Sequence, residues 1–522
     1  MSGYELVITH YHLNRGGVTR VIEGHLRALA TLPPHQRPTR VLIVSGGRSS
    51  GWDPTLAGQL PFQLDLAWLE LLEYDSQQDK LTSVDALYAA LTSLLDRHGF
   101  HAARTVLHVH NHSLGKVAAW PATLEKLASD GWRMLLQIHD FAEDQRPGNY
   151  RHMVECADGI ETLQSQLYPQ AAHVHFSVLT RRDADILADA GMERDRLHLL
   201  PNPVRVDQEV AAAESKKRDA AREKLFTQYD VEPDRPYVLY PVRGIRRKSV
   251  GELLLWAALC DQAAFGLTLA PVNPAEKTSY DRWVACSKTL GLSVMFNVGG
   301  SMTLDESYAA ADAILTTSVA EGFGMVYLEG CLARKPLFGR DIPGVTADFR
   351  QQGLQFPNLV ESLIVPQALI DMEKFLHSQR QLLEGLRASY GVDVSDQNSR
   401  ISSDAEFEGD TIDFGRLDSV SQRSVVEQVR HDAAVRQAIC ELNPVVSRLI
   451  DSPSDTASIL DANITAIENG YAENVIGSTL YHVYESVLGC ELSSVLRRSE
   501  IAAAVLQGFL LPDRFFAVRL ES

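Results

Sequence analysis

The 522-residue sequence has no long apolar run, no closely spaced cysteine pair and no excess of positive charge. A membrane-spanning helix needs roughly 18 or more consecutive apolar residues, and a secretory signal needs a basic segment followed by an apolar one. We therefore expect neither an integral membrane segment nor a secretory signal. The six cysteines are scattered without a CxxC motif, which is typical of reduced thiols in a cytoplasmic protein.

The shortage of positive charge narrows the range of partners. The sequence has 49 Lys and Arg against 67 Asp and Glu, a formal net charge of −18. A field of that sign repels nucleic acid and anionic lipid unless a local basic patch overrides it. The one short basic run, at 216–218, is interleaved with acids and indicates a solvated helix face. We expect no nucleic-acid partner, and a homo-oligomer stays open.

What the sequence does contain is a regular series of short, β-branched apolar runs separated by helix-like stretches. The first series comprises 5–12, 40–46, 105–112, 133–141, 174–180 and 197–204. The second series comprises 237–243, 267–272, 294–300, 312–318 and 336–342. Nearly continuous apolar strands alternating with helices predict parallel sheets covered on both faces.

The length and this pattern together predict more than one domain. We expect an N-terminal Rossmann-like domain over 1–205, a charged linker over 206–235 and a second Rossmann-like domain over 236–390. Residues 391–522 are expected to hold an acidic insertion followed by a mainly helical C-terminal region. Within that region, 501–520 is a candidate for a last helix that crosses back to the N-terminal domain.

The stretch TSVAEGFGMVYLE (317–329) is the most informative motif. A predicted strand runs into a glycine-containing loop and then into a helix, with Glu321 in the loop and Glu329 about two turns into the helix. Gly322 and Gly324 allow a ligand to approach the backbone, and a helix N-terminus offers unpaired N–H groups. The two acids could contact different parts of one extended ligand; an ordinary loop with acids facing solvent is the alternative.

Cations and a second glycine loop accompany this motif. Arg243 and Lys248 follow the strand that opens the second domain, and ligands of open parallel sheets bind at the carboxyl ends of the strands. Two cations there suit a diphosphate; surface loop charges are the alternative. Gly16 and Gly17 follow the first strand and precede a helix, where phosphate or sugar could bind.

These features, with the His139-Asp140 strand end and the Asn202-Pro203 pair, resemble glycosyltransferase family 4 and span residues 1 to about 345. The resemblance implies the GT-B fold, with two Rossmann-like domains facing a central cleft, and retaining sugar transfer without a metal or other cofactor. The chain departs from the family pattern after Lys248, where Ser249 and Val250 precede a glycine. It departs again where Asn202 is followed by proline.

The resemblance also implies roles for individual residues. Glu329 would hold the donor ribose, Glu321 and the neighbouring amides the sugar hydroxyls, and Arg243 and Lys248 the diphosphate, while His139 would face the transferred sugar. The implied catalytic set is His139, Arg243, Lys248 and Glu321. The implied donor-binding set is Gly16, Gly17, Asn202, Arg243, Lys248, Glu321, Gly322, Phe323, Gly324, Met325, Val326 and Glu329.

The implied reaction moves a hexose from a UDP-glucose or GDP-mannose type of donor to a small soluble acceptor, forming an alpha-glycosidic bond. Loops after two first-domain strands carry Asn111, His112, Lys116 and Arg146, which we expect to border the acceptor. Cations in a protein with a charge of −18 indicate an anionic acceptor such as a carboxylate or phosphate. Solvated loop charges are the alternative.

Three rival functions remain. Alternation in HVHNHS (108–113) would point His108, His110 and His112 to one face of a strand, and with His139 they could form the zinc site of a hydrolase. We see no further ligand cluster at suitable spacing, so we predict no metal ligands and expect His108 and His110 to pack inside the strand layer. The other rivals are a nucleotide-sugar epimerase or sugar phosphorylase of the same fold and a non-catalytic sugar-binding relative.

Overall fold

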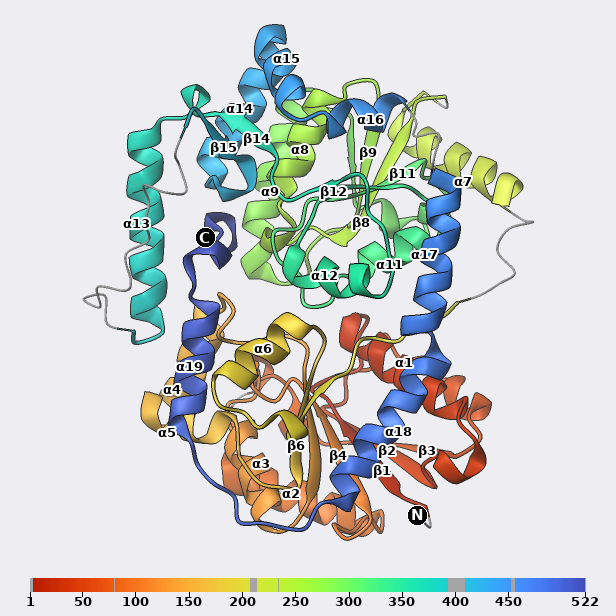
Figure 1. The fold of residues 1–522 in the computed structure, drawn as a ribbon, viewed down its shortest axis with the longest axis vertical. Helices are drawn as coiled ribbons and strands as arrows, with labels where there is room; N and C mark the ends of the chain where they lie inside the picture. The colour runs from red at the N-terminus through yellow and green to blue at the C-terminus, as the bar shows by residue number, and fades with distance from the viewer. Residues whose placement is uncertain are drawn as a thin grey trace. The chain divides into compact units, whose positions relative to one another are not determined.

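The computed structural model describes residues 3–78, 80–206, 214–232, 234–392, 409–451 and 456–521. Parts of two expected segments, 207–213 of the linker and 393–408 of the acidic insertion, lie outside the described residues. The chain forms two compact units (Figure 1). Unit 1 comprises 1–205, 388–392 and 468–511, and unit 2 comprises 206–387, 393–467 and 512–522.

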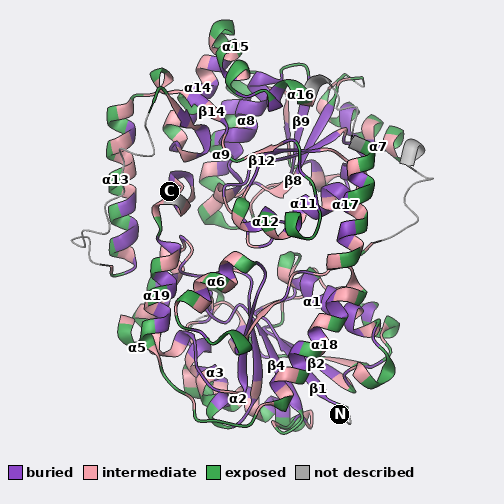
Figure 2. Cartoon of the chain, viewed as in Figure 1, coloured by how far each residue is buried: buried purple, intermediate pink, exposed green. Residues whose placement is uncertain are grey.

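Unit 1 is built on a parallel sheet in the order β3-β2-β1-β4-β5-β6-β7. Its strands are β1 (Glu5–Thr9), β2 (Arg40–Ser45), β3 (Gln63–Trp68), β4 (Thr105–His110), β5 (Arg133–Ile138), β6 (Val174–Val178) and β7 (Leu197–Leu199). Every residue of β1, β4 and β6 is buried (Figure 2). This burial is what continuous apolar runs predict for a sheet covered on both faces.

Helices from both ends of the sequence cover this sheet. They are α1 (Gly17–Ala30), α2 (Val84–Arg97), α3 (Trp120–Ser129), α4 (Pro147–Cys156), α5 (Ile160–Leu167), α6 (Arg181–Asp189), α18 (Glu473–Gly489) and α19 (Ser499–Phe509). Ile22 and Leu26 of α1 share one apolar cluster with Leu480 and Tyr484 of α18. Residues more than 440 positions apart therefore complete a single core.

Unit 2 contains a second parallel sheet, in the order β10-β9-β8-β11-β12-β13. Its strands are β8 (Tyr237–Arg243), β9 (Ala264–Leu269), β10 (Val294–Phe296), β11 (Ala313–Thr316), β12 (Leu337–Arg340) and β13 (Leu359–Val360). A separate antiparallel pair joins β14 (Ile364–Pro366) to β15 (Thr411–Asp413). Within the described chain, the parallel sheets expected from the two series of apolar runs are confirmed.

The helices of unit 2 include most of the C-terminal region. They are α7 (Glu214–Tyr229), α8 (Val250–Leu259), α9 (Pro274–Thr289), α10 (Leu304–Ala310), α11 (Met325–Leu332), α12 (Pro343–Gln351), α13 (Met372–Ser389), α14 (Ser419–His431), α15 (Ala433–Leu442), α16 (Val445–Asp451) and α17 (Thr456–Tyr471). The last residues of α13 and α17 belong to unit 1. Across the described residues, no helix is long and apolar enough to cross a membrane.

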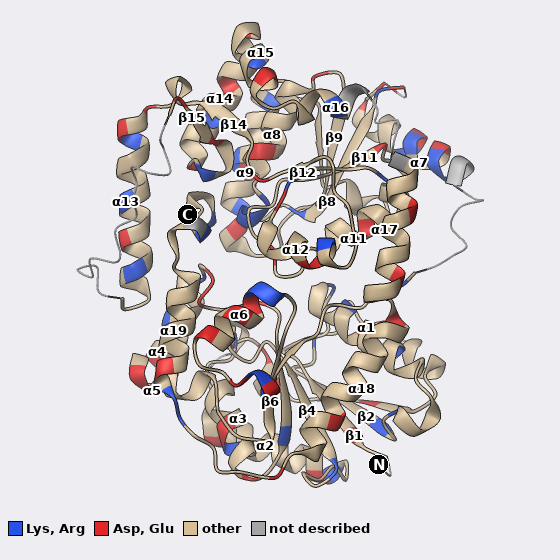
Figure 3. Ribbon diagram, viewed as in Figure 1, with Lys and Arg blue, Asp and Glu red and all other residues tan. Residues whose placement is uncertain are grey.

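The charged segment expected as a linker contains a helix that packs onto unit 2. Many residues of α7 are of charged types (Figure 3), yet Leu225 and Phe226 are buried. Arg222 Nη1 donates to Asp312 Oδ1 at 2.9 Å, and Asp312 immediately precedes β11 in the sequence. The described residues of α7 are therefore held to the sheet by both apolar and ionic contacts.

Candidate functional site

Hydrogen bonds join two loops at the carboxyl edge of the unit 2 sheet. The backbone oxygen of Lys248 accepts hydrogen bonds from Tyr240 Oη and from Thr317 Oγ1, each at 3.0 Å. Tyr240 Oη also bonds Ser318 Oγ at 2.7 Å. The loop after β8 and the loop after β11 are thus held in one place, where ligands of open parallel sheets bind.

These hydrogen bonds place Lys248 beside Glu321, and the two side chains form a buried ion pair. Lys248 Nζ contacts Glu321 Oε1, and the two residues are 9% and 8% exposed. Burial acts to raise the pKa of Glu321, but the positive charges of Lys248 and Arg247 outweigh it, so the pKa is lowered. Glu321 is therefore ionised at neutral pH, and its carboxylate holds the Lys248 ammonium in place.

The sequence departure after Lys248 has a structural counterpart. Ser249 adopts a φ of 44°, in the left-handed region, which usually favours glycine because it lacks a Cβ. Val250 then begins α8 directly. The left-handed turn after Lys248 is therefore made by a serine.

The EGFG loop ends at the start of α11. Gly324 has a φ of 83°, and a Cβ on it would lie 2.6 Å from the Tyr327 ring, so glycine is required there. Phe323 packs edge-on against Phe349 at 5.4 Å between ring centroids. No side chain in the described structure caps this helix start, so the first amides of Met325 and Val326 are available to an anion.

Glu329 lies about one helical turn beyond Met325, not the expected two, because α11 begins at Met325; it is half-buried. Tyr308 Oη donates to its Oε2 at 3.2 Å. Gly322 is half-buried in the same loop as Glu321. The predicted donor residues of the EGFG segment therefore follow one another along a single strand–loop–helix unit.

Arg243 ends β8, at a register irregularity between Tyr240 and Arg243. Its Nη1 donates to the backbone oxygen of Ala270 at 2.9 Å. The next cation, Arg246, is oriented by Glu276, which accepts from its backbone N at 2.8 Å, and by the backbone oxygen of Glu521. The Arg243–Lys248 segment is thus held on both sides within unit 2.

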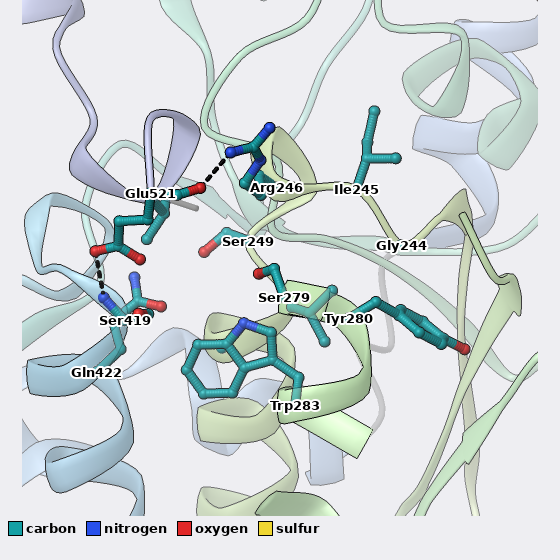
Figure 4. A pocket seen from close by; sticks show the side chains of 13 residues that line it. Gly244, Ile245, Arg246, Ser249, Ser279, Tyr280, Trp283, Ser419, Gln422 and Glu521 are labelled. Atoms are coloured by element: carbon teal, nitrogen blue, oxygen red, sulfur yellow. Dashed lines mark hydrogen bonds between the residues drawn. The ribbon is translucent and has the colours of Figure 1, made fainter. Parts of the chain in front are cut away.

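A small pocket of about 10 Å³ lies behind this segment. Ser249, Gln422 and Glu521 line it together with Tyr280 and Trp283 (Figure 4). The Glu521 side chain accepts from the backbone N of Ser419 at 2.9 Å. This volume is about that of a single water, so the pocket supports the loop and is too small for a nucleotide.

In unit 1 the predicted glycine loop opens α1. Gly16 is the N-cap in extended conformation, and no described side chain caps the helix there. Both glycines are exposed, and nothing lies within 4 Å of a Cβ built on Gly17. Thr19 Oγ1 donates to Asn14 O at 2.7 Å, which holds the turn. The start of α1 can therefore present backbone amides to an anion.

The carboxyl ends of three unit 1 strands are tied together through Asn111. Its Oδ1 accepts from the backbone N of His139 at 2.7 Å and of Asp140 at 3.1 Å. Its backbone oxygen accepts from Tyr11 Oη at 2.5 Å. Burial lowers the pKa of His139 to about 4, so this imidazole is neutral at pH 7.

The expectation that His112 shares a face with His108 and His110 is wrong. Strand β4 ends at His110, and Asn111 turns into the left-handed region with a φ of 60°, which breaks the alternation. His112 is fully buried, its Nε2 lies 2.9 Å from Leu167 O, and it packs near Tyr168. The other two rings stack with centroids 4.4 Å apart.

The cations expected near an acceptor lie in loops after β4 and β5. Lys116 Nζ bonds Asn149 Oδ1 at 3.3 Å and lies 5.4 Å from the Tyr74 ring centroid. Burial and the nearby Arg146 charge lower the pKa of Lys116. Arg146 itself bonds Asp140 Oδ1 at 2.5 Å. Lys116 is therefore the cation of this pair without a carboxylate within salt-bridge distance in the described structure.

Asn202 is buried, and its Oδ1 has no hydrogen-bond partner among the described residues. The ring of Pro203 packs against α1 at Gly24, where a Cβ would lie 2.6 Å from it. The proline that replaces the glycine of the family pattern thus has a packing role in unit 1.

Some functional neighbours were not identified from the sequence. Arg247 lowers the pKa of Glu321, and Tyr240 and Thr317 hold the Lys248 loop. Two sequence features could have indicated this region. The consecutive cations of RGIRRK follow one strand, and the hydroxyls of Thr317 and Ser318 follow another. His25, on α1, had no such sequence signal.

Comparisons with known proteins support the fold and the enzyme class. No family model matches the chain. The mannosylglucosyl-3-phosphoglycerate synthase of Petrotoga mobilis is 25% identical over 430 residues, covering 79% of this chain and 78% of that protein. Anabaena HepE in complex with UDP and glucose superposes with a TM-score of 0.54 at 13% identity, covering 92% of this chain and 100% of HepE.

A glycosyltransferase from Rickettsia africae also has a TM-score of 0.54 at 13% identity, over 94% of this chain and 100% of that structure. The expected GT-B fold, two Rossmann-like parallel sheets with a helical C-terminal region, is confirmed. The relative and the structural neighbours are glycosyltransferases, and they support a transferase.

Proposed function

We propose that this chain is a retaining glycosyltransferase, as in family 4, that moves a hexose from a UDP-glucose or GDP-mannose type of donor to a small anionic acceptor, forming an alpha-glycosidic bond. The observation that carries the proposal is the buried Lys248–Glu321 pair beside the uncapped start of α11. The relative named for mannosylglucosyl-3-phosphoglycerate synthesis and the structure of HepE with UDP and glucose support it.

The proposed mechanism uses the side chains of the unit 2 strand edge. Lys248 and Arg243 offset the charge that develops on the leaving diphosphate, so that no metal ion is required. Glu329 accepts hydrogen bonds from the ribose hydroxyls, and Glu321, ionised by its cationic neighbours, accepts from the sugar hydroxyls. The leaving phosphate takes the proton of the acceptor hydroxyl, as the family resemblance implies.

The anionic acceptor is supported by unit 1. The partly buried Lys116 contacts the side-chain amide of Asn149 and the Tyr74 ring. Arg48 lies over the same ring, 5.3 Å from its centroid. The relative's name contains 3-phosphoglycerate, which carries both a phosphate and a carboxylate. An acceptor of that class would give Lys116 a charged partner.

Lys248→Ala tests the donor site. Loss of one preorganised donor to a developing charge lowers kcat about 100-fold or more, and the fold should persist. Turnover is measured with UDP- and GDP-hexoses, and NMR of the product gives its anomeric configuration. Lys277→Ala is the matched control, because Lys277 is an exposed partner of Asp281.

Near-normal turnover of Lys248→Ala would contradict the donor site. A beta-configured product would contradict retention, and donor conversion without any acceptor would indicate the epimerase alternative. A panel of neutral, carboxylated and phosphorylated glycosides identifies the acceptor class.

A further inference from the structure

Three histidines meet inside unit 1. They are His25 on α1 and His108 and His110 on β4, all 0% exposed. One ring nitrogen from each lies within 4.8 Å of the others. The rings of His25 and His108 have centroids 5.6 Å apart.

The hydrogen bonding of these rings is incomplete. Neither ring nitrogen of His25 has a hydrogen-bond partner among the described residues, and neither does His110 Nε2. Buried imidazole nitrogens are normally hydrogen-bonded or bound to a metal, because removing them from water without a partner is costly. One nitrogen of His25 and Nε2 of His110 can therefore share a common partner.

The surroundings favour a transition metal over other partners. We propose that His25, His108 and His110 bind one ion of the Zn²⁺ class through their ring nitrogens. Among the described residues, the group holds three histidines and no carboxylate, which disfavours Mg²⁺ and Ca²⁺, whereas imidazole suits Zn²⁺ and its transition-metal neighbours. Two histidines two residues apart on a strand and a third from a neighbouring element can supply a three-imidazole set.

The neighbours of the cluster suit this role. His110 Nδ1 lies 2.8 Å from His139 Nε2, so metal binding at His110 Nε2 places the shared proton on His110 Nδ1 and fixes the tautomer of His139. His108 bonds Tyr484 Oη and Gln137 Oε1, each at 2.8 Å. One of these bonds is exchanged for the metal bond, and the other then orients the ring.

Burial also keeps the three ligands in the required state. It lowers the pKa of His108 to about 3 and the pKa of His25 and His110 well below the ordinary value. Neutral imidazole is the form that binds metal. The ion would connect α1 to β4. Metal binding is measured without substrate, so its failure can be told apart from a failure of the proposed transfer.

Metal content of the full-length protein tests the proposal without any substrate. The purified chain is treated with Zn²⁺ and gel-filtered, and we expect about one equivalent of zinc to remain bound. His25→Gln should lose that equivalent while keeping its near-UV circular dichroism. His198→Gln should retain it, because His198 belongs to a different stacked pair, with His175 at 5.0 Å between centroids.

X-ray absorption of the wild-type protein decides the outcome even if His25→Gln fails to fold. A shell dominated by imidazole nitrogens at about 2.0–2.1 Å supports the site. Less than a tenth of an equivalent bound, an unchanged metal content in folded His25→Gln, or a shell dominated by sulfur or carboxylate would each overturn it.

Discussion

Lys116 is the residue that we propose to bind the anionic acceptor. Its ammonium is partly buried, beside Asn149 and the Tyr74 ring, and burial lowers its pKa. An acceptor phosphate or carboxylate would restore a favourable charge environment, since a charge-assisted hydrogen bond is about twice as strong as a neutral one.

We expect Lys116→Gln to raise the KM for an anionic acceptor about 10-fold or more, because a hydrogen bond to a charged group contributes about 1.5–3 kcal/mol. The KM for the donor should not change. Initial-rate kinetics over both substrates measure this. Lys126→Gln is the control, because Lys126 pairs with Asp85 at an exposed site. Equal loss for donor and acceptor would argue against a role in acceptor binding.

The buried carboxyl group of Glu143 makes the free energy of unfolding depend on pH. It is fully buried, and burial raises its pKa to about 7; Tyr168 Oη donates to its Oε1 at 2.9 Å. Its unfolded pKa is about 4.5, so between pH 4.5 and 7 the folded state retains a proton that the unfolded state loses. The free energy of unfolding therefore falls as pH rises through this window and is constant above it.

Glu143→Gln removes this pH-dependent loss, because glutamine can still accept from Tyr168 and does not ionise. A difference of about 2.5 pKa units corresponds to about 3 kcal/mol. The variant should exceed the wild type by about that free energy at pH 8 and match it near pH 4. Urea unfolding at both pH values measures the difference, and a pH-independent offset would contradict it.

At the scale of elements, the segment from Arg243 to Lys248 depends on support from the far C-terminus. Arg246 bonds Glu276 and the backbone oxygen of Glu521, and both contacts hold the loop that carries Lys248. If these two contacts of Arg246 were lost, the loop would gain alternative conformations. Only a fraction of the molecules could then bind the diphosphate of the proposed donor.

We expect Arg246→Met to raise the donor KM about 10-fold, which corresponds to about 1.4 kcal/mol, with a smaller effect on kcat. Isothermal titration with UDP and GDP checks the same change without turnover. Arg423→Met serves as the control, because Arg423 pairs with Glu427 on the exposed face of α14. Unchanged nucleotide affinity would show that the loop is rigid without Arg246.

Sequence patterns located the buried strands and the glycine loops because both have a local signature. Strand β3 was not predicted, since it is an edge strand whose residues are largely exposed and its pattern is not a continuous apolar run. His25 and Glu521 could not be assigned either: each acts on residues about 80 to 275 positions away in sequence. His112 was placed wrongly because the Asn111 turn has no regular sequence pattern.

In the molecule as a whole, the chain leaves unit 1 after residue 205, contributes residues 388–392 to it, and returns to it at 468. Helix α18 closes the core over α1, and its Gly477 approaches so closely that a Cβ there would lie 2.3 Å from Ala28 O. Unit 1 is therefore complete only after residues 468–511 have been synthesised.

Gly477→Ala should destabilise unit 1 by about 1–3 kcal/mol, because the backbone of α1 must shift to relieve the overlap. Gly489→Ala, in the same helix, meets nothing within 4 Å and should be neutral or stabilising by up to about 1 kcal/mol, since alanine favours helix more than glycine does. Calorimetry of both full-length variants compares them. If the two substitutions shift Tm in the same direction, α18 does not contact α1 as closely as the structure shows, and unit 1 does not depend on the returning chain in this way.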